Sequence, residues 1–272
     1  MLTEPRQDAK LLFFDIETLP NIVAAFTIQG RQNISHKQIL KRCQVMCISW
    51  AWGDGKVQHD ITDLSRYDWY KKDDDADMML VSNFVEMAQE ADMVIGQNSS
   101  FDIGHLRSRL VKYSKELNNL DFRPTLIDDT YYNTKDIYFD SHKLDDVGDY
   151  LGYGNKEQHG DGYEWWIDVM RGDTKRLDKM VYYCDGDVKR TRQVYKHIKP
   201  FIKSSLNKAV WFNRPDACPS CGQSERALII RKYNQKRQPV FQCPVCNAYP
   251  FTKGKSGVGK KETGYPMKEY NR

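Results

Sequence analysis

The sequence predicts an α/β protein, with a mixed β-sheet flanked by helices and a small cysteine-rich module behind it. Short apolar runs typical of strands come early and in series, and segments with helical periodicity then mix with them. Four cysteines stand near the C-terminus as two Cys-x-x-Cys pairs. The chain has 272 residues, 40% hydrophobic and 29% charged, which is enough for one ordinary domain with a real core and a small second one.

The elements of the first hundred residues follow from their hydrophobic pattern. Residues 11–17, LLFFDIE, form a short apolar run that ends in carboxylates, which predicts a buried strand. Residues 45–52 predict a second strand followed by a Gly-Asp-Gly turn, and residues 56–61 predict a returning third strand. Apolar residues at helical spacing predict a helix over 78–91, and residues 93–96 predict another short strand.

The next hundred residues are expected to be mainly helical. Residues 102–117 predict a helix with a basic outer face, and residues 125–128 predict a short strand. Three further helices are expected at 142–151, 163–171 and 174–198. Pro200 marks the end of the last and longest of these helices, because proline cannot continue one.

Composition changes after Pro200 and divides the chain. We expect a first domain over residues 1–205, a cysteine module over 210–252, and a basic, glycine-rich, mobile tail over 253–272. Residues 199–272 hold 15 lysines and arginines against 4 acids, a net charge of +11, whereas the preceding residues hold 26 against 33, a net charge of −7. Clustered carboxylates suit metal binding, and a basic segment suits a polyanion.

Signals for export or membrane insertion are not found in the sequence. No run of about 18 apolar residues predicts a membrane span. The N-terminus lacks the basic-then-apolar pattern of a secretory signal, because Glu4 and Asp8 interrupt it. We therefore expect a cytoplasmic protein without a membrane partner, in which paired cysteines bind metal rather than form disulfides.

The first candidate functional residues are two carboxylates on the first strand. Asp15 and Glu17 are two positions apart, so the alternation of a strand places both side chains on one face. Two neighbouring carboxylates repel each other at neutral pH unless a cation lies between them. The alternative is an ordinary solvent-exposed strand end.

Two further segments add acidic side chains. Asp102 follows the sequence Asn98-Ser-Ser-Phe101 and opens a helix, where an acid also serves as an ordinary first-turn residue. Tyr183 and Asp187 are four residues apart on the long predicted helix, so they share one helix face. An amphipathic surface is the alternative for this pair.

Taken in order, FDIET, N-x-x-F-D and Y-x-x-x-D resemble the three exonuclease motifs of the DnaQ-like superfamily, which has a ribonuclease H-like fold. The tyrosine in the third motif is similar to the DEDDy branch, which includes the proofreading domains of family B DNA polymerases, and small phage-encoded exonucleases have a similar layout. The resemblance covers residues 10–200. It includes SHKLDDVGDYLG at 141–152, which is similar to the helix between the second and third motifs.

The resemblance implies a catalytic centre with two Mg²⁺ or Mn²⁺ ions, bound by the quartet Asp15, Glu17, Asp102 and Asp187. Two such ions, about 3.5–4 Å apart, activate water and stabilise the leaving 3′ oxygen. Carboxylate oxygens suit these hard cations. Tyr183 would orient the attacking water rather than act as a base, because the pKa of tyrosine is near 10.

The resemblance also implies contacts with the substrate. Leu19 matches a position that packs against the terminal bases, and Asn98 and Phe101 are expected to shape the same pocket. A place in the core is an equally consistent interpretation of Phe101. Tyr182 stands where the DEDDh branch requires a histidine, which argues against that branch.

The C-terminal cysteines predict a zinc ribbon. Cys218 and Cys221, and then Cys243 and Cys246, offer four thiolates, which favours one tetrahedral, structural Zn²⁺ ion. The segments ALIIRKY and PVFQC between the pairs flank a polar turn and predict a β-hairpin. A redox dithiol is the alternative.

The charge of the ribbon suggests contact with nucleic acid. Four basic side chains of the hairpin are expected to contact phosphates: Arg231, Lys232, Lys236 and Arg237. Docking of another protein is the alternative function for this module.

The function implied is that of a metal-dependent 3′–5′ exonuclease, a phosphodiester hydrolase acting on the 3′ ends of single-stranded DNA. Alternatives are an exoribonuclease or an oligonucleotide-degrading enzyme on the same scaffold, and a non-catalytic nucleic-acid-binding accessory protein. A replication or repair protein is expected as a further partner, in the cytoplasm of a bacterial or phage-infected cell.

Overall fold

The structure is a computed structural model that describes residues 9–27, 33–124, 126–135, 137–154, 162–199, 201–202, 218, 229–233 and 239–245. The chain divides into two compact units, which are described separately: Lys10–Tyr195, and a second unit formed by Met1–Ala9 together with Lys196–Arg272. Within these described ranges, no helix is both long enough and apolar enough to cross a membrane.

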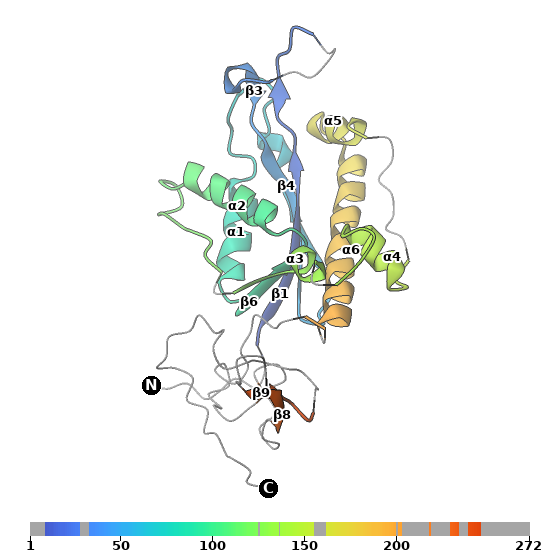
Figure 1. Cartoon of the computed structure of the whole chain (residues 1–272). Helices are drawn as coiled ribbons and strands as arrows, with labels where there is room; N and C mark the ends of the chain where they lie inside the picture. Colours follow the sequence, from blue (N-terminus) through green and yellow to red (C-terminus); the bar gives the residue numbers. More distant parts are fainter. Residues whose placement is uncertain are drawn as a thin grey trace. The chain divides into compact units, whose positions relative to one another are not determined.

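A five-stranded mixed sheet forms the centre of the first unit (Figure 1). Its strand order is β5-β4-β1-β6-β7, with bounds Gln58–Ile61, Gln44–Trp52, Leu11–Leu19, Met93–Gly96 and Ile127–Asp129. The central strand β1 pairs antiparallel with β4 and parallel with β6. The mixed sheet flanked by helices confirms the predicted fold class.

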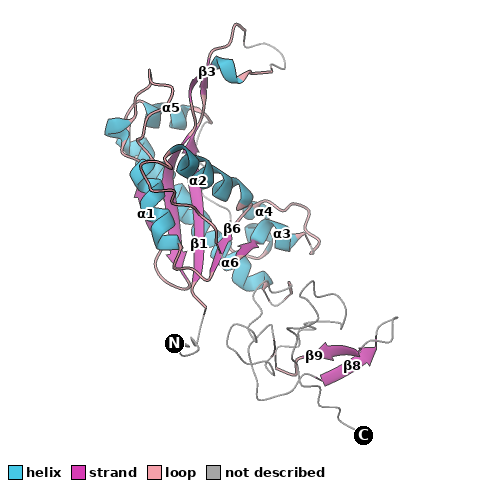
Figure 2. Cartoon of the chain, turned by 90° about the vertical axis from the view of Figure 1, so that its left-hand side faces the viewer, coloured by secondary structure: helices cyan, strands magenta, loops and turns pink. Residues whose placement is uncertain are grey.

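Helices cover both faces of this sheet (Figures 1 and 2). Helices α1 (Met78–Ala88) and α2 (Ser100–Lys112) lie on one face, and the long helix α6 (Thr174–Ile198) lies on the other. Three short helices complete the unit: α3 (Thr130–Thr134), α4 (Leu144–Tyr150) and α5 (Glu164–Met170). The bounds of α6 match the predicted 174–198, and it ends two residues before Pro200.

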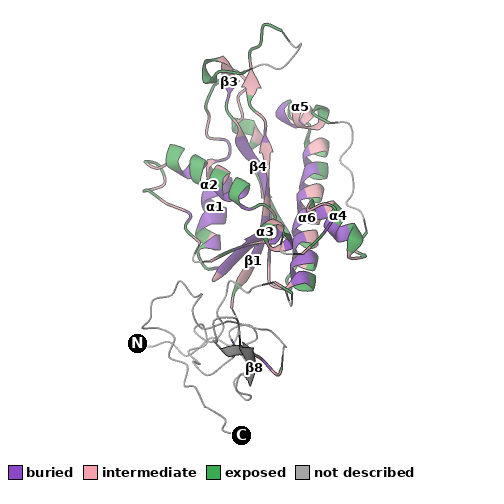
Figure 3. Cartoon of the chain, viewed as in Figure 1, coloured by how far each residue is buried: buried purple, intermediate pink, exposed green. Residues whose placement is uncertain are grey.

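The alternation of β1 explains why there are two cores. Leu12, Phe14 and Ile16 point toward α1 and α2 and join one buried cluster. Phe13 points the other way, where its ring packs edge-on against Tyr195 of α6 at 5.6 Å. Figure 3 shows the central strands and the inward sides of α1 and α6 as mostly buried. The residues of β1 that face α6 therefore include the position of Asp15, two residues beyond Phe13.

Several small elements were not predicted from the sequence. Strands β2 (Ile22–Val23) and β3 (Ile39–Lys41) pair with each other, and short 3₁₀ turns occupy His36–Gln38 and Leu64–Arg66. Helix α3 was also missed. None of these elements is longer than five residues, so none carries a hydrophobic period that a sequence pattern could reveal.

The second unit contains a two-stranded antiparallel sheet, β8 (Ile229–Tyr233) with β9 (Pro239–Gln242). This is the hairpin predicted between the cysteine pairs, and Arg231 and Lys232 lie in β8. Cys218 and Cys243 are both buried. Three groups of predicted residues lie outside the described ranges: Cys221 and Cys246, Lys236 and Arg237, and the tail 253–272.

Candidate active site

Three of the four predicted carboxylates converge between β1 and α6. Asp15 and Glu17 are half-buried on β1, and Asp187 is buried on α6. Each offers an oxygen, and these ligand atoms all lie within 4.8 Å of one another. The strand brings the first pair to one face and the helix packed across it supplies the third acid, so residues 170 positions apart share one site.

The fourth carboxylate, Asp102, lies beside this cluster in the first turn of α2. Its Oδ1 accepts a hydrogen bond of 3.1 Å from the backbone N–H of Ile16, the residue between the two acids of β1. Burial, helped by the negative charges of Asp129 and Asp187, raises the pKa of Asp102 to about 7, although the bond from Ile16 opposes this. A cation placed at the cluster would favour the charged form.

Asp129, at the end of β7, holds the loop that leads to Asp102. Its carboxylate accepts hydrogen bonds from Asn98 N at 3.0 Å, Ser99 N at 2.8 Å and Ser99 Oγ at 2.9 Å. It also caps α3 by accepting from Tyr131 N at 3.0 Å. Asn98 has a φ of +58°, in the left-handed region that asparagine tolerates better than most residues. The sequence gave no sign of these contacts, because they join residues about 30 positions apart.

Tyr183 lies one helical turn before Asp187, on the side of α6 that faces the cluster. Burial raises its pKa well above the ordinary value of tyrosine, and the negative charges of Asp187, Glu17 and Asp145 add to the effect. The phenol therefore stays protonated at neutral pH and can donate a hydrogen bond. Asp145 of α4 is close enough to contribute.

Asp185, two residues before Asp187, belongs to another environment. Its Oδ1 accepts a hydrogen bond of 2.7 Å from Ser49 Oγ on β4, and its Oδ2 lies 3.1 Å from His59 Nδ1 on the edge strand β5. These partners hold Asp185 toward β4 and β5. It is therefore absent from the group of acids that could hold an ion together, among the residues that the structure describes.

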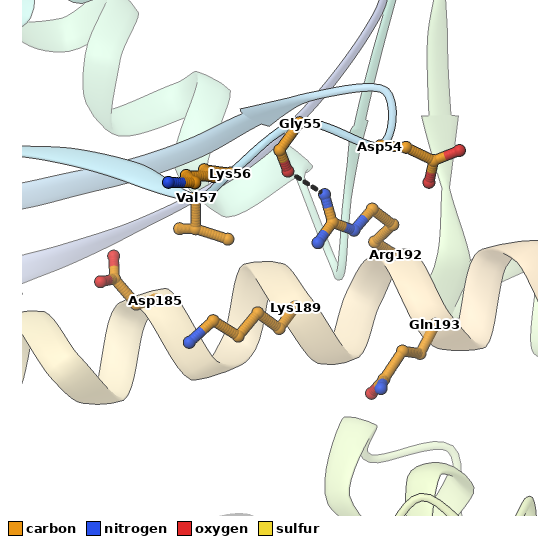
Figure 4. Close-up of a pocket in the computed structure, with 8 residues that line it drawn as sticks. All are labelled: Asp54, Gly55, Lys56, Val57, Asp185, Lys189, Arg192 and Gln193. Atoms are coloured by element: carbon orange, nitrogen blue, oxygen red, sulfur yellow. Dashed lines mark hydrogen bonds between the residues drawn. The ribbon is translucent and has the colours of Figure 1, made fainter.

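An open pocket of about 560 Å³ lies beside Asp185, between α6 and the turn that joins β4 to β5 (Figure 4). Arg192 closes one side by donating a hydrogen bond of 2.6 Å to the carbonyl of Gly55. Lys56 and Lys189 also line the pocket. None of the four predicted carboxylates lines it, so it is separate from the acidic cluster.

The residues expected to contact the substrate have different surroundings. Leu19 is fully buried and packs with the core beneath α6, so its side chain has no surface to offer to a base. Phe101 is 49% exposed, and its ring centroid lies 4.3 Å from that of His105 one turn later on α2. Its exposure excludes the core interpretation of Phe101.

The first unit has a mixed sheet covered by helices on both faces. Its central strand carries two acids, and the helix packed against that strand carries a third. This arrangement is that of a ribonuclease H-like nuclease domain. The chain belongs to the RNase_H superfamily, because the RNase_H_2 family model matches residues 41–199. That range contains Asp102, Tyr183 and Asp187 and begins after β1.

Comparison with solved structures finds similar chains. One is the family B DNA polymerase from the hyperthermophilic archaeon Pyrobaculum calidifontis, with 20% sequence identity and a TM-score of 0.49. The match covers 71% of this chain and 25% of the polymerase chain, so it spans about a quarter of that protein's length. No curated protein matches the sequence.

Proposed function

We propose that the protein is a metal-dependent 3′–5′ exonuclease that hydrolyses phosphodiester bonds at the 3′ end of single-stranded DNA. The observation that carries the proposal is the convergence of Asp15, Glu17 and Asp187, whose ligand oxygens lie within 4.8 Å of one another. Membership of the RNase_H superfamily supports a nuclease. The tyrosine one turn before Asp187 supports the DEDDy form of such an enzyme.

The donor set suits Mg²⁺ or Mn²⁺. Asp15, Glu17 and Asp187 offer only carboxylate oxygens, which are the ligands these hard cations prefer, and Asp102 lies beside them as the fourth acid. A pair of bound ions would supply an activated water and stabilise the charge that develops on the leaving oxygen. Such ions also reduce the repulsion among the carboxylates, which is otherwise a cost of bringing them together.

The chain's own groups would position the reactants. Tyr183 keeps its proton, so its hydroxyl donates a hydrogen bond that orients the attacking water. Asp102 fixes the backbone of β1 between the two acids by accepting from Ile16 N. Phe101, half exposed beside His105, offers a ring face to a terminal base.

A zinc ribbon over residues 210–252 remains part of the proposal, following a nuclease domain over 1–205. The hairpin formed by β8 and β9, and the burial of Cys218 and Cys243, support a compact module built around thiolates. The positive charge of this part of the sequence suits a role in holding nucleic acid.

Degradation of an end-labelled strand tests the proposed activity. Full-length protein with Mg²⁺ or Mn²⁺ should shorten a 5′-labelled single strand stepwise and release nucleoside 5′-monophosphates. Asp15→Asn should reduce the rate by about a thousandfold or more, because it removes a charge from the metal site. Tyr183→Phe should retain metal binding and reduce kcat by about 10²-fold, through loss of one hydrogen bond to the water.

The matched control is Asp178→Asn, at an exposed acid on the same helix as Asp187, and it should leave the rate unchanged. Parallel digestion of RNA and of short oligonucleotides separates the alternative substrates. Tight binding without hydrolysis of any of them would favour the accessory-protein alternative. Equal rates for the wild type and Asp15→Asn would refute the proposed metal site.

A further inference from the structure

Two basic side chains of α6 lie over an aromatic ring of α5, on the helix face that also carries Tyr183 and Asp187. Trp165 of α5 lies beneath two basic side chains of α6: the guanidinium carbon of Arg176 is 5.0 Å from its ring centroid, and Nζ of Lys179 is 5.5 Å from it. We propose that this surface, Trp165 with Arg176 and Lys179, binds the single strand immediately upstream of the 3′ end held in the acidic site. The inference rests on the proposed function and names the residues that would hold its single-stranded substrate.

Helical spacing places this surface next to the site. Arg176, Lys179, Tyr183 and Asp187 stand at positions i, i+3, i+7 and i+11, so they share one face of α6. Eight residues separate Lys179 from Asp187, a rise of about 12 Å along the helix axis. Figure 1 shows α5 beside the N-terminal end of α6, the end of the helix at which Arg176 and Lys179 contact Trp165.

Electrostatics explain why the site needs such a surface. The acidic cluster repels a polyanion, and cations nearby offset that repulsion and guide the substrate. Lys179 is exposed and forms no salt bridge with the residues that the structure describes. Arg176 lies 3.4 Å from a carboxylate oxygen of Asp168, so part of its charge is already balanced. Lys179 is therefore the stronger candidate for a phosphate contact.

Trp165 makes the surface specific for an unpaired strand. Its indole is only partly buried and packs on the core cluster beneath α6, which holds the ring in place. Unpaired bases stack on indole rings and guanidinium groups, whereas the bases of a duplex hide their faces from such contacts. Aromatic and basic side chains placed together are the combination used to bind single strands.

Binding and turnover of matched variants test the surface in the full-length protein. Affinity for a fluorescein-labelled single DNA strand is measured by anisotropy over a range of salt concentrations, with Ca²⁺ replacing Mg²⁺ to prevent turnover. Lys179→Gln should raise Kd about 3- to 10-fold at low salt and reduce the salt slope by about 0.7, the value for one phosphate contact. Trp165→Leu should weaken binding about tenfold or more with little change in the slope, because stacking is not ionic.

The control is Lys189→Gln. Lys189 is another exposed lysine of α6, and it also lies over an aromatic ring, that of Tyr182 at 5.9 Å, but on a different face of the helix. This variant should bind and degrade DNA like the wild type. Unchanged affinity and slope in Lys179→Gln, or an equal loss in Lys189→Gln, would overturn the inference. An equal loss of duplex affinity in Trp165→Leu would overturn the preference for single strands.

A minimal substrate separates this inference from the proposed function. The p-nitrophenyl ester of thymidine 5′-monophosphate has the scissile phosphate and no upstream strand. For Lys179→Gln, the ratio of kcat/KM on the oligonucleotide to kcat/KM on the ester should fall by the same 3- to 10-fold factor as the affinity. If the wild type hydrolyses neither substrate, the proposed function fails, while the binding measurements still decide the role of the surface.

Discussion

Asp129→Asn should disturb the acidic site without removing any of its four carboxylates. An asparagine has the same shape, and its remaining oxygen can still accept from Asn98 N and Tyr131 N. Its amide, however, would face the N–H and hydroxyl of Ser99, which now donate to Asp129 Oδ2 at 2.8 and 2.9 Å. Losing a hydrogen bond to a charged acceptor costs about 1.5–3 kcal/mol. The Ser99 hydroxyl can rotate and accept from the new amide, but the Ser99 N–H cannot, so we expect a loss of about 1.5–3 kcal/mol in unfolding free energy.

The catalytic consequence of Asp129→Asn follows from the place of this loop in the chain. The residues from Asn98 to Ser99 lead directly into α2, whose first turn positions Asp102 against Ile16 N. A displacement of about 1 Å at a catalytic group costs on the order of 10²-fold in rate, so kcat should fall by about that factor.

Urea denaturation and steady-state kinetics on the same preparations check both effects of Asp129→Asn. Asp146→Asn, at an exposed acid in the first turn of α4, is the matched control and should change neither quantity. A variant that loses stability but keeps full kcat would show that the loop does not set the position of Asp102. Wild-type values for both quantities would refute the bracing role altogether.

Two further predictions concern the stability of the chain. Asp77→Asn should lower the unfolding free energy by about 3–5 kcal/mol, measured by urea denaturation, because buried Arg109 loses the carboxylate that accepts two hydrogen bonds of 2.8 Å from it. The control is Asp75→Asn, which breaks an exposed ion pair with Arg66 and should lower the unfolding free energy by at most about 1 kcal/mol. Elemental analysis of the purified protein should find one zinc ion per chain. Cys218→Ser or Cys243→Ser should each remove this zinc. Full zinc content in both variants would exclude these cysteines as ligands.

The sequence predicted the large elements of the fold because each carries its own hydrophobic pattern. Residues 93–96 and 174–198 have the predicted bounds, and the strand expected at 11–17 extends to Leu19. Helix α2 begins at Ser100 and ends at Lys112, earlier than the predicted 102–117 at both ends. Helix ends depend on local capping and tertiary contacts that periodicity does not encode.

The candidate site was predictable where spacing alone determines geometry. Two acids two residues apart on a strand share a face whatever surrounds them, and the same holds for Tyr183 and Asp187 on a helix. Leu19 was different, because it lies beyond an irregularity in the pairing of β1 at Glu17 and Thr18 and becomes buried under α6. Its burial depends on a helix more than 150 residues further along the chain, which local pattern cannot reveal.

Asp145 is a residue whose contribution to the site the local sequence pattern does not reveal. On the sequence alone it is a first-turn acid of a short helix, and nothing distinguishes it from its neighbour Asp146. Its proximity to Tyr183 arises because α4 packs closely on α6: a Cβ atom added to Gly148 would lie 2.6 Å from Cδ of Arg190. The glycine therefore permits an approach that brings a fifth carboxylate toward the tyrosine.

Helix α6 connects the parts of the proposed mechanism. One face of it carries Asp187, proposed to bind metal, Tyr183, proposed to orient water, and the cation Lys179. Cys184 between them packs on the sheet, with its thiol 3.5 Å from Asp15 Oδ2. These groups lie on one continuous helix. Helix geometry therefore fixes the distance between the residues proposed to bind the DNA strand and the acids proposed to hold the catalytic metal ions. Substrate binding and cleavage would then be aligned without movement of a loop.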